Sequence, residues 1–223
     1  MKILVNGKNI ETTAYDYETL RKQHQPMADT LIVSGHSKPW TTAISDGDDV
    51  LLLDSSATPS PELWRAIYDA RYGRDIMDRF QAGRVAICGL GGLGSLVALE
   101  LARLGVGQLL LIDGDHVDPT NLARQHYTVP QIGEKKADAL ADTIRISAPL
   151  TQVETAAVWL NEENMVSLLK DWPFVCECLD RPETKALLTN TVLSQLPQTT
   201  LVGASGMAGY SSGNTITTKQ VLS

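Results

Sequence analysis

One stretch, residues 83–125, constrains the fold of this chain more than any other. It reads GRVAICGLGGLGSLVALELARLGVGQLLLIDGDHVDPTNLARQ and sets Gly89, Gly91 and Gly94 in the pattern G-x-G-x-x-G between an apolar run and an Ala/Leu-rich segment. Between a strand and a helix, the first glycine makes the turn, the second lets a phosphate approach the backbone, and the third allows close helix packing. The stretch therefore predicts a strand–turn–helix unit that binds a nucleotide.

The chain beyond residue 60 continues this alternation of strands and helices. The expected strands cover residues 84–90, 108–113, 152–158, 174–180 and 199–204, and the expected helices cover residues 61–81, 95–104, 134–148, 161–171 and 182–196. Parallel strands joined by helical crossovers form an open sheet with helices on both faces. The fold class predicted for this part is α/β, a doubly wound, Rossmann-like, mostly parallel sheet.

The first sixty residues have a different pattern. The expected strands cover residues 1–7, 8–14, 29–35 and 48–54, and the expected helix covers residues 15–24. The dipeptide Asn6-Gly7 is a hairpin signal, and Asp16 can cap the helix. This order predicts a small mixed sheet crossed by one helix. It resembles the β-grasp or ubiquitin-like fold and, through MKILVNGK and ISDGDDVLLL, is more closely similar to the sulfur carrier ThiS.

The N-terminal segment departs from such a carrier at its end. A working carrier ends in a flexible Gly-Gly whose carboxylate reacts, whereas here the last strand runs into DSSATPSPELW, which has the composition of a linker. We therefore expect that this ThiS-like domain lacks a reactive end, cannot itself be charged, and has a docking or regulatory role.

The loop after the second strand of the parallel sheet carries the residues that distinguish among nucleotides. Asp113 closes that strand, where a carboxylate accepts hydrogen bonds from ribose hydroxyls of NAD, FAD or ATP alike. Asn121, Arg124 and Gln125 follow at the carboxyl edge. The forked, always charged guanidinium of Arg124 matches phosphate oxygens, so the loop favours a triphosphate over a hydride-transfer cofactor. A solvated arginine in a polar loop is the alternative.

Two further positions are open to two interpretations each. Lys135 and Lys136 begin a helix, where cations are mildly unfavourable; a phosphate would explain one of them and solvation the other. Asp180 follows a later apolar strand at the ligand edge. Its carboxylate can hold Mg²⁺ together with phosphates, or it can cap the helix that starts near Pro182.

Composition narrows the partners. A net charge of −7 and a pI near 5.1 provide no electrostatic footprint for nucleic acid, which is therefore not an expected partner. With three cysteines, no C-x-x-C and four histidines, no zinc is expected. No apolar run approaches the roughly 20 residues of a membrane span. Lys8 and Glu11 interrupt the N-terminus where a signal peptide needs an apolar core, so a cytoplasmic location is expected.

Five motifs recur in an order that resembles the ThiF/MoeB adenylyltransferases, relatives of ubiquitin-activating enzymes. They are RYGRDI, GLGGLGS, LLLIDGDHVDPTNLARQ, GEKKADAL and CECLDRPETK. The resemblance implies transfer of AMP from ATP to the C-terminal glycine carboxylate of a ubiquitin-like sulfur carrier ending in Gly-Gly. ThiS, in thiamine thiazole biosynthesis, is the carrier that the fused ThiS-like domain favours.

The resemblance also assigns roles by position. It implies that Gly91 and its neighbours lie along the phosphates and Asp113 on the ribose, and that Asp180 binds Mg²⁺. The resemblance implies that Arg74 reaches the ATP of a neighbouring subunit, and therefore that the protein is a homodimer. The implied catalytic set is Arg74, Arg124, Lys136 and Asp180, and the implied ATP-binding set is Gly89, Gly91, Gly92, Gly94, Asp113, Asp115, Asn121 and Gln125. The implied domains are a β-grasp domain over residues 1–57, a linker over 58–64 and an ATP-binding domain over 65–223.

The chain departs from the family pattern in ways that leave alternatives open. It lacks the two zinc-binding C-x-x-C pairs and the reactive cysteine of a crossover loop, and it has Arg181 where an asparagine is usual. Because Ser223 follows soon after GASGMAGYSSGN, we expect the final strands and helix of the family's domain to be missing or short in this chain. We expect a short, zinc-free, ThiF-like protein without covalent sulfur transfer. Activation of another carrier, an ATP-dependent tRNA dehydratase and a non-catalytic binding module are the alternatives.

Overall fold

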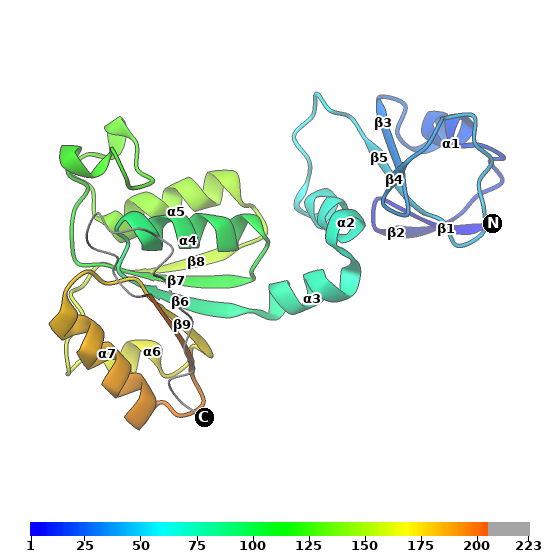
Figure 1. Cartoon of the computed structure of the whole chain (residues 1–223). Helices are drawn as coiled ribbons and strands as arrows, with labels where there is room; N and C mark the ends of the chain where they lie inside the picture. Colours follow the sequence, from blue (N-terminus) through cyan, green and yellow to red (C-terminus); the bar gives the residue numbers. More distant parts are fainter. Residues whose placement is uncertain (205–223) are drawn as a thin grey trace, which may run out of the picture.

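Two five-stranded sheets form the cores of the chain in the computed structural model, which describes residues 1–204. Helices α2 (Pro61–Tyr72) and α3 (Arg74–Ala82) connect them, as Figure 1 shows. The first sheet is mixed and the second is entirely parallel. This arrangement confirms the predicted fold class, a doubly wound α/β unit preceded by a β-grasp domain.

The N-terminal sheet has the order β2-β1-β5-β3-β4, with β1 and β5 parallel at its centre. Its elements are β1 (Lys2–Val5), β2 (Lys8–Glu11), α1 (Tyr17–His24), β3 (Thr30–Val33), β4 (His36–Ser37) and β5 (Asp49–Leu53). Asn6 and Gly7 have φ values of 49° and 79°, the left-handed pair that a tight hairpin requires. The Asp16 side chain accepts a hydrogen bond from the Thr19 amide (2.8 Å) and caps α1. The two-residue strand β4 was not predicted.

The second sheet has the order β10-β9-β6-β7-β8, so the direction of winding reverses between β6 and β9. Its strands are β6 (Arg84–Cys88), β7 (Gln108–Ile112), β8 (Gln152–Ala156), β9 (Phe174–Glu177) and β10 (Thr200–Gly203). Its helices are α4 (Gly92–Arg103), α5 (Lys136–Ser147), α6 (Met165–Leu169) and α7 (Pro182–Gln195), with short 3₁₀ turns at Pro119–Asn121 and Val129–Gln131. Ligands bind in such sheets outside the carboxyl ends of the strands, at the point of reversal.

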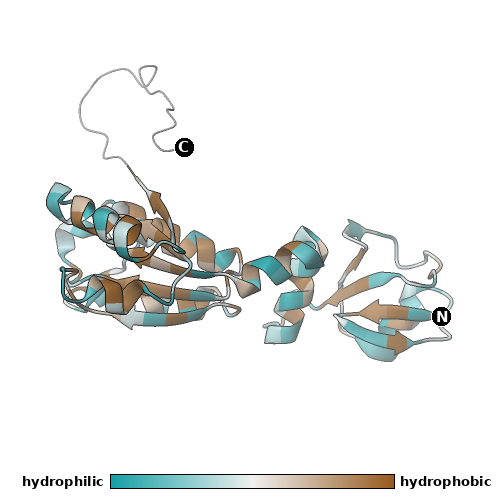
Figure 2. Ribbon diagram, turned by 90° about the horizontal axis from the view of Figure 1, so that it is seen from below, coloured by the Kyte–Doolittle hydropathy of each residue, from teal (hydrophilic) through white to brown (hydrophobic). Residues whose placement is uncertain are grey.

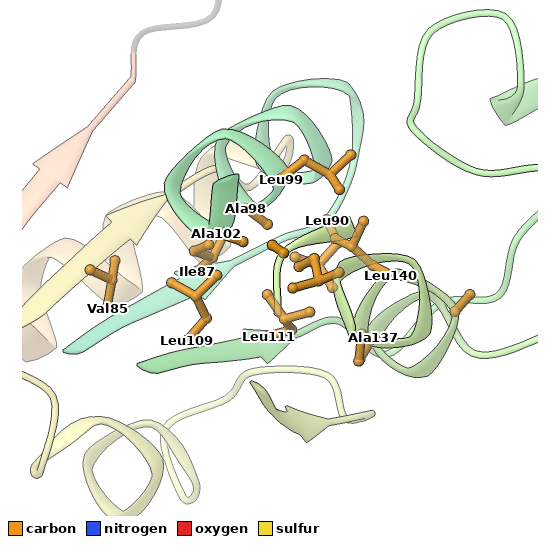
Figure 3. Close-up of a cluster of buried hydrophobic side chains, with 14 of the residues drawn as sticks. Val85, Ile87, Leu90, Ala98, Leu99, Ala102, Leu109, Leu111, Ala137 and Leu140 are labelled. Atoms are coloured by element: carbon orange, nitrogen blue, oxygen red, sulfur yellow. The ribbon is translucent and has the colours of Figure 1, made fainter. Parts of the chain in front are cut away.

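Apolar side chains fill both faces of this parallel sheet. Helices α4 and α5 cover one face and α6 and α7 cover the other (Figure 1). Figure 3 shows Ile87, Leu109 and Leu111 of the strands packed against Ala98 and Leu140 of the helices. Because both faces are covered, the inner strands β6 and β7 read as nearly continuous apolar runs, whereas the edge strand β8 (QVETA) is largely polar. Figure 2 shows hydrophobic residues along the inner strands.

Three predicted helices differ from the structure by more than two residues at an end or by a break. The helix expected over 61–81 is broken at Gly73, whose φ of +89° belongs to the left-handed region and ends α2 before α3 begins. Helix α4 begins at Gly92 and not at residue 95, because the Gly-rich segment forms its first turn. The helix expected over 161–171 is reduced to α6.

The domain boundaries and the end of the chain are not settled by residues 1–204. The domain boundaries stay a prediction; α2 begins at Pro61, within the segment expected to be a linker. The expectation of missing final strands and helix lies outside residues 1–204. Within those residues, every helix is too short or too polar to cross a membrane.

We predict that Gly94→Ala destabilises the parallel domain. A Cβ built at Gly94 would lie 1.8 Å from the Gly89 carbonyl oxygen, and that oxygen belongs to the backbone of a buried turn. The free energy of unfolding should fall by on the order of 3 kcal/mol in urea denaturation.

Gly91→Ala is the matched control. Its Cβ would have its nearest neighbour, Gln125 Nε2, at 4.0 Å, so the free energy of unfolding should change by about 1 kcal/mol or less. Equal losses in the two variants would contradict the packing role of Gly94.

Candidate nucleotide-binding site

A cavity of about 890 Å³ opens at the carboxyl edge of the parallel sheet, where the winding reverses. Its walls come from the loops after β6, β7, β8 and β9 and from the first turns of α4, α5 and α7. The sequence-predicted residues that line it are Gly89, Gly91, Gly92, Asp113, Asp115, Asn121, Arg124, Gln125, Lys136 and Asp180. These predicted residues lie up to 91 positions apart in the sequence, from Gly89 to Asp180, and the fold brings them to one place.

The Gly-rich turn presents the N-terminus of α4 to the cavity. Gly89 has a φ of +89° and donates its amide to the Ile112 carbonyl (2.9 Å), which attaches the turn to β7. Gly91 is the N-cap and supplies no side-chain cap, so the amides of the first helical turn keep their capacity to donate. Gly94 does not line the cavity; it is buried where α4 meets the Gly89 backbone, the packing role predicted for the third glycine.

Asp113 joins two of the loops that form the cavity. One carboxylate oxygen accepts a hydrogen bond from the Leu90 amide (2.7 Å) and the other from the Asp115 amide (2.9 Å). The residue therefore holds the Gly-rich turn against the loop after β7. Each oxygen retains a further lone pair for ribose hydroxyls, so this structural role adds to the predicted one.

The short turn after β7 orients three polar side chains. Asn121 is buried and uses its side-chain oxygen to accept the Asp118 amide (3.2 Å). Arg124 is exposed and donates to the Thr120 carbonyl (3.1 Å), so its remaining N–H groups are available to a ligand. Gln125 is buried, and its side-chain oxygen has no hydrogen-bond partner among the described residues. A buried acceptor of this kind needs a donor from water or a ligand.

Lys136 is the lysine of the pair that enters the cavity. It is 5% exposed, and its Nζ lies 2.6 Å from an Asp115 carboxylate oxygen. Burial opposes ionisation of Asp115, but hydrogen bonds from Lys136 and the His116 amide, and the charge of Lys136, together hold the pKa of Asp115 below its ordinary value. Lys135 lies outside the cavity lining.

Asp180 is an exposed side chain at the cavity wall. Arg181, and not Asp180, occupies the N-cap position of α7, which has no side-chain cap hydrogen bond. The helix-cap interpretation of Asp180 is therefore wrong. Among residues 1–204 its carboxylate has no hydrogen bond or ion-pair partner, so its oxygens are accessible to a cation.

Several cavity residues were not found by sequence reasoning. Trp159 is 60% exposed, lies against Gly114 and has the Arg181 guanidinium 5.7 Å from its ring centroid. Lys185 reaches the cavity from α7 and pairs with the buried Glu177 of β9. No local pattern marks these side chains, because tertiary packing alone places them at the cavity.

Arg74 lies elsewhere in the chain. Its Nε is 3.5 Å from an Asp69 carboxylate oxygen at the junction of α2 and α3, and its side chain is 52% exposed. It does not line the cavity of its own chain.

Comparison with known proteins decides the family. The ThiF family model matches residues 65–221, and a model of ThiS-like ubiquitin matches residues 1–54. The chain belongs to the ThiF family. Its parallel domain is the ThiF part and its β-grasp domain the ThiS-like part, as the sequence motifs predicted.

Two relatives of this ThiF-family chain both have the name "adenylyltransferase and sulfurtransferase". That from Aspergillus fumigatus, Uba4, is 34% identical over 55% of the chain and 27% of its own length. That from Caenorhabditis briggsae, MOCS3, is 35% identical over 72% of the chain and 38% of its own length. The chain thus spans well under half the length of these curated relatives.

A solved structure that resembles the chain is Escherichia coli tRNA N6-threonylcarbamoyladenosine dehydratase, TcdA, in complex with ATP. It is 26% identical with a TM-score of 0.63, and the match covers 71% of this ThiF-family chain and 65% of TcdA.

We predict that Lys136→Met raises the pKa of the Asp115 carboxyl toward its ordinary value. The substitution removes the cation that favours the ionised form, while burial continues to oppose ionisation. Because folding lowers this pKa, the pair stabilises the fold above the ordinary carboxyl range, and that contribution is lost as the pH falls through the lowered value.

The measurement is a ¹³C NMR titration of the Asp115 carboxyl carbon. Lys135→Met is the matched control, since no hydrogen bond or ion pair joins the side chains of Lys135 and Asp115 within residues 1–204, and it should leave the titration unchanged. The same Asp115 midpoint in wild type and Lys136→Met would refute the ion pair.

Proposed function

We propose that this chain is an ATP-dependent adenylyltransferase that transfers AMP to the C-terminal glycine carboxylate of a ubiquitin-like sulfur carrier. The observation that carries the proposal is the convergence on one cavity of the α4 N-terminus, Arg124, Lys136 and Asp180, which belong to four separate segments. An anion-binding helix end, two cations and a free carboxylate are what a magnesium–triphosphate complex requires. The names of the Uba4 and MOCS3 relatives and the ATP-bound TcdA structure support it.

The cavity suits ATP by its volume of about 890 Å³ and by its unused polar groups. The uncapped first turn of α4 donates amides to phosphate, and the absence of a side chain at Gly91 leaves room for its approach. The unpartnered oxygen of Gln125 calls for a donor from the ligand or a bound water. With the phosphates at α4, Asp113 is placed for the ribose, as in other sheets of this class.

The exposed carboxylate of Asp180 fits Mg²⁺. This ion is usually held by one or two carboxylates together with substrate phosphates, and Asp180 supplies one exposed carboxylate to the cavity lining. When bound, Mg²⁺ would neutralise charge on the triphosphate and favour departure of pyrophosphate.

The reaction needs positioning and charge neutralisation more than proton transfer. An oxygen of the carrier carboxylate forms a bond to the α-phosphorus, and the bond from that phosphorus to the bridging oxygen of pyrophosphate breaks. The nucleophile is already ionised at neutral pH, so no general base is required. Arg124 and Lys136 would hold the phosphates in line and offset the charge that accumulates during transfer.

The carrier that accepts AMP is a separate protein in this proposal. The chain's own β-grasp domain has no Gly-Gly, and after β5 it continues directly toward α2. The Ser55 amide donates to the Asp29 carboxylate (3.2 Å), which attaches the segment after β5 to the domain itself. The ThiS-like character of that domain favours ThiS and thiazole synthesis over a molybdopterin-type carrier.

A tRNA dehydratase is the second candidate, because the solved structure of TcdA matches most of the chain. The net charge of −7 disfavours it, since tRNA binding depends on cations that neutralise phosphates.

We further propose a homodimer in which Arg74 acts on the ATP of the neighbouring copy. Arg74 lies outside the cavity of its own chain and is half exposed, which suits action in trans.

We predict that the protein catalyses ATP–pyrophosphate exchange with a Gly-Gly-ending sulfur carrier and that Arg124→Ala lowers the exchange rate by about 100-fold or more. Arg124 is exposed and its hydrogen bond in the fold is to a loop carbonyl, so the variant should keep its melting temperature. Arg145→Ala is the matched control, an exposed arginine of α5 outside the cavity, and should exchange at the wild-type rate.

The choice of carrier separates the candidate functions. Exchange with a ThiS-type carrier supports the proposal, exchange with a molybdopterin-type carrier alone reassigns the pathway, and ATP hydrolysis stimulated by tRNA supports the dehydratase. ATP binding without exchange on any carrier identifies a binding module. Wild-type exchange by Arg124→Ala would falsify the proposed site.

We predict complementation between Arg74→Ala and Asp180→Ala, each inactive alone. In a mixed dimer one site combines the intact Asp180 of one chain with the intact Arg74 of the other. An equal mixture should therefore recover about a quarter of the wild-type exchange rate. Absence of recovery in dimers shown to have mixed would exclude action of Arg74 in trans.

A further inference from the structure

Glu177 and Lys185 form a largely buried ion pair beside the cavity. Glu177, the last residue of β9, is 4% exposed, and the Nζ of Lys185 lies 2.6 Å from one of its carboxylate oxygens. Taking a carboxylate out of water is costly, and a single counter-ion offsets that cost only with further hydrogen bonds. We therefore expect the pair to make further hydrogen bonds.

Both partners bind the same residue, Leu179. The second carboxylate oxygen of Glu177 accepts the Leu179 amide (2.7 Å), and Lys185 Nζ donates to the Leu179 carbonyl (3.1 Å). One residue earlier, the Cys178 amide donates to the Cys88 carbonyl of β6 (2.8 Å). The backbone that leads from β9 to Asp180 is thus fixed at successive polar groups.

Asp180 depends on this backbone for its position. Its side chain is exposed and has no partner among residues 1–204 that would orient it, in contrast to Asp113 and Asp115, which are held by hydrogen bonds. The place of its carboxylate relative to the α4 N-terminus therefore follows from the conformation of residues 178–181.

We infer that Glu177 and Lys185 are positioning residues for Asp180, and that their ion pair sets the carboxylate where it binds Mg²⁺ together with the nucleotide. The inference rests on the proposed function, because it assumes that ATP occupies the cavity. Unlike Arg124 and Lys136, Lys185 is not proposed to contact the phosphates. Its ammonium binds Glu177 and Leu179, so it acts on Mg²⁺ through the position of the backbone.

The test compares ATP affinity with excess Mg²⁺ and with EDTA, by titration calorimetry on the full chain. In the wild type Mg²⁺ should tighten ATP binding; we call the ratio of the ATP affinity with Mg²⁺ to that with EDTA the Mg²⁺ gain. In Lys185→Met this Mg²⁺ gain should fall by about 10-fold, because Asp180 is no longer held in place. The ATP affinity of that variant in EDTA should stay within about twofold of wild type. Lys185→Arg should restore the gain, because its guanidinium can donate to both Glu177 and Leu179.

A second variant covers the outcome in which Lys185→Met fails to fold around an unpaired Glu177. The double substitution Glu177→Gln with Lys185→Met leaves no buried charge, keeps an acceptor for the Leu179 amide, and removes the bond to the Leu179 carbonyl. It should fold and show the same reduced Mg²⁺ gain.

Three results would overturn the inference. If the variants keep the wild-type Mg²⁺ gain and only their melting temperature falls, the ion pair has a structural role alone. Equal loss of ATP affinity with Mg²⁺ and with EDTA would make Lys185 a direct phosphate ligand. In both cases the proposed function stands. No effect of Mg²⁺ on ATP binding by the wild type would remove the inference and the role of Asp180 together.

Discussion

The close approach of α4 to the turn after β6 is the constraint on which the rest of the site depends. A Cβ at Gly94 would overlap the Gly89 carbonyl oxygen, so the helix can begin where it does only because that position has no side chain. This contact aims the amides of the first turn at the carboxyl edge of the sheet, and Asp113 then attaches the turn to the loop after β7. Helix packing at Gly94 and the hydrogen bonds of Asp113 together fix the direction of these amides, on which the proposed phosphate site depends.

Some charged side chains of the site form ion pairs, whereas others have only backbone partners or none among residues 1–204. Two lysines at the cavity, Lys136 and Lys185, each have a carboxylate partner at 2.6 Å, whereas Arg124 faces the cavity with a carbonyl partner. Pairing makes buried cations tolerable in the absence of ligand. The two pairs differ in what the carboxylate does: Asp115 is half exposed and can share Lys136 with a phosphate, while Glu177 is buried and binds Leu179 as well.

The sequence predicts those parts of the structure that local rules govern. The glycine spacing, the apolar runs of the strands and the Asn6-Gly7 hairpin depend on neighbouring residues, and the structure has all of them. The break at Gly73 was not predicted, since a glycine within a helical pattern can be tolerated or can end a helix. The packing of distant segments decides the features that local rules do not. It leaves Asp180 a free carboxylate and not a helix cap, and it brings Trp159 and Lys185 to the cavity.

The β-grasp domain has contacts that suit a fixed module better than a mobile carrier. Helix α2 lies against both of its hairpin turns, so that a Cβ at Gly7 would be 3.6 Å from the Ala66 Cβ and one at Gly35 would be 3.1 Å from the Ala70 carbonyl. At the end of the same helix, Asp69 binds Arg65 (2.6 Å) and approaches Arg74. Because Arg74 begins α3 only one residue after α2 ends, the contacts of α2 with the β-grasp turns help to fix the position of Arg74 relative to that domain.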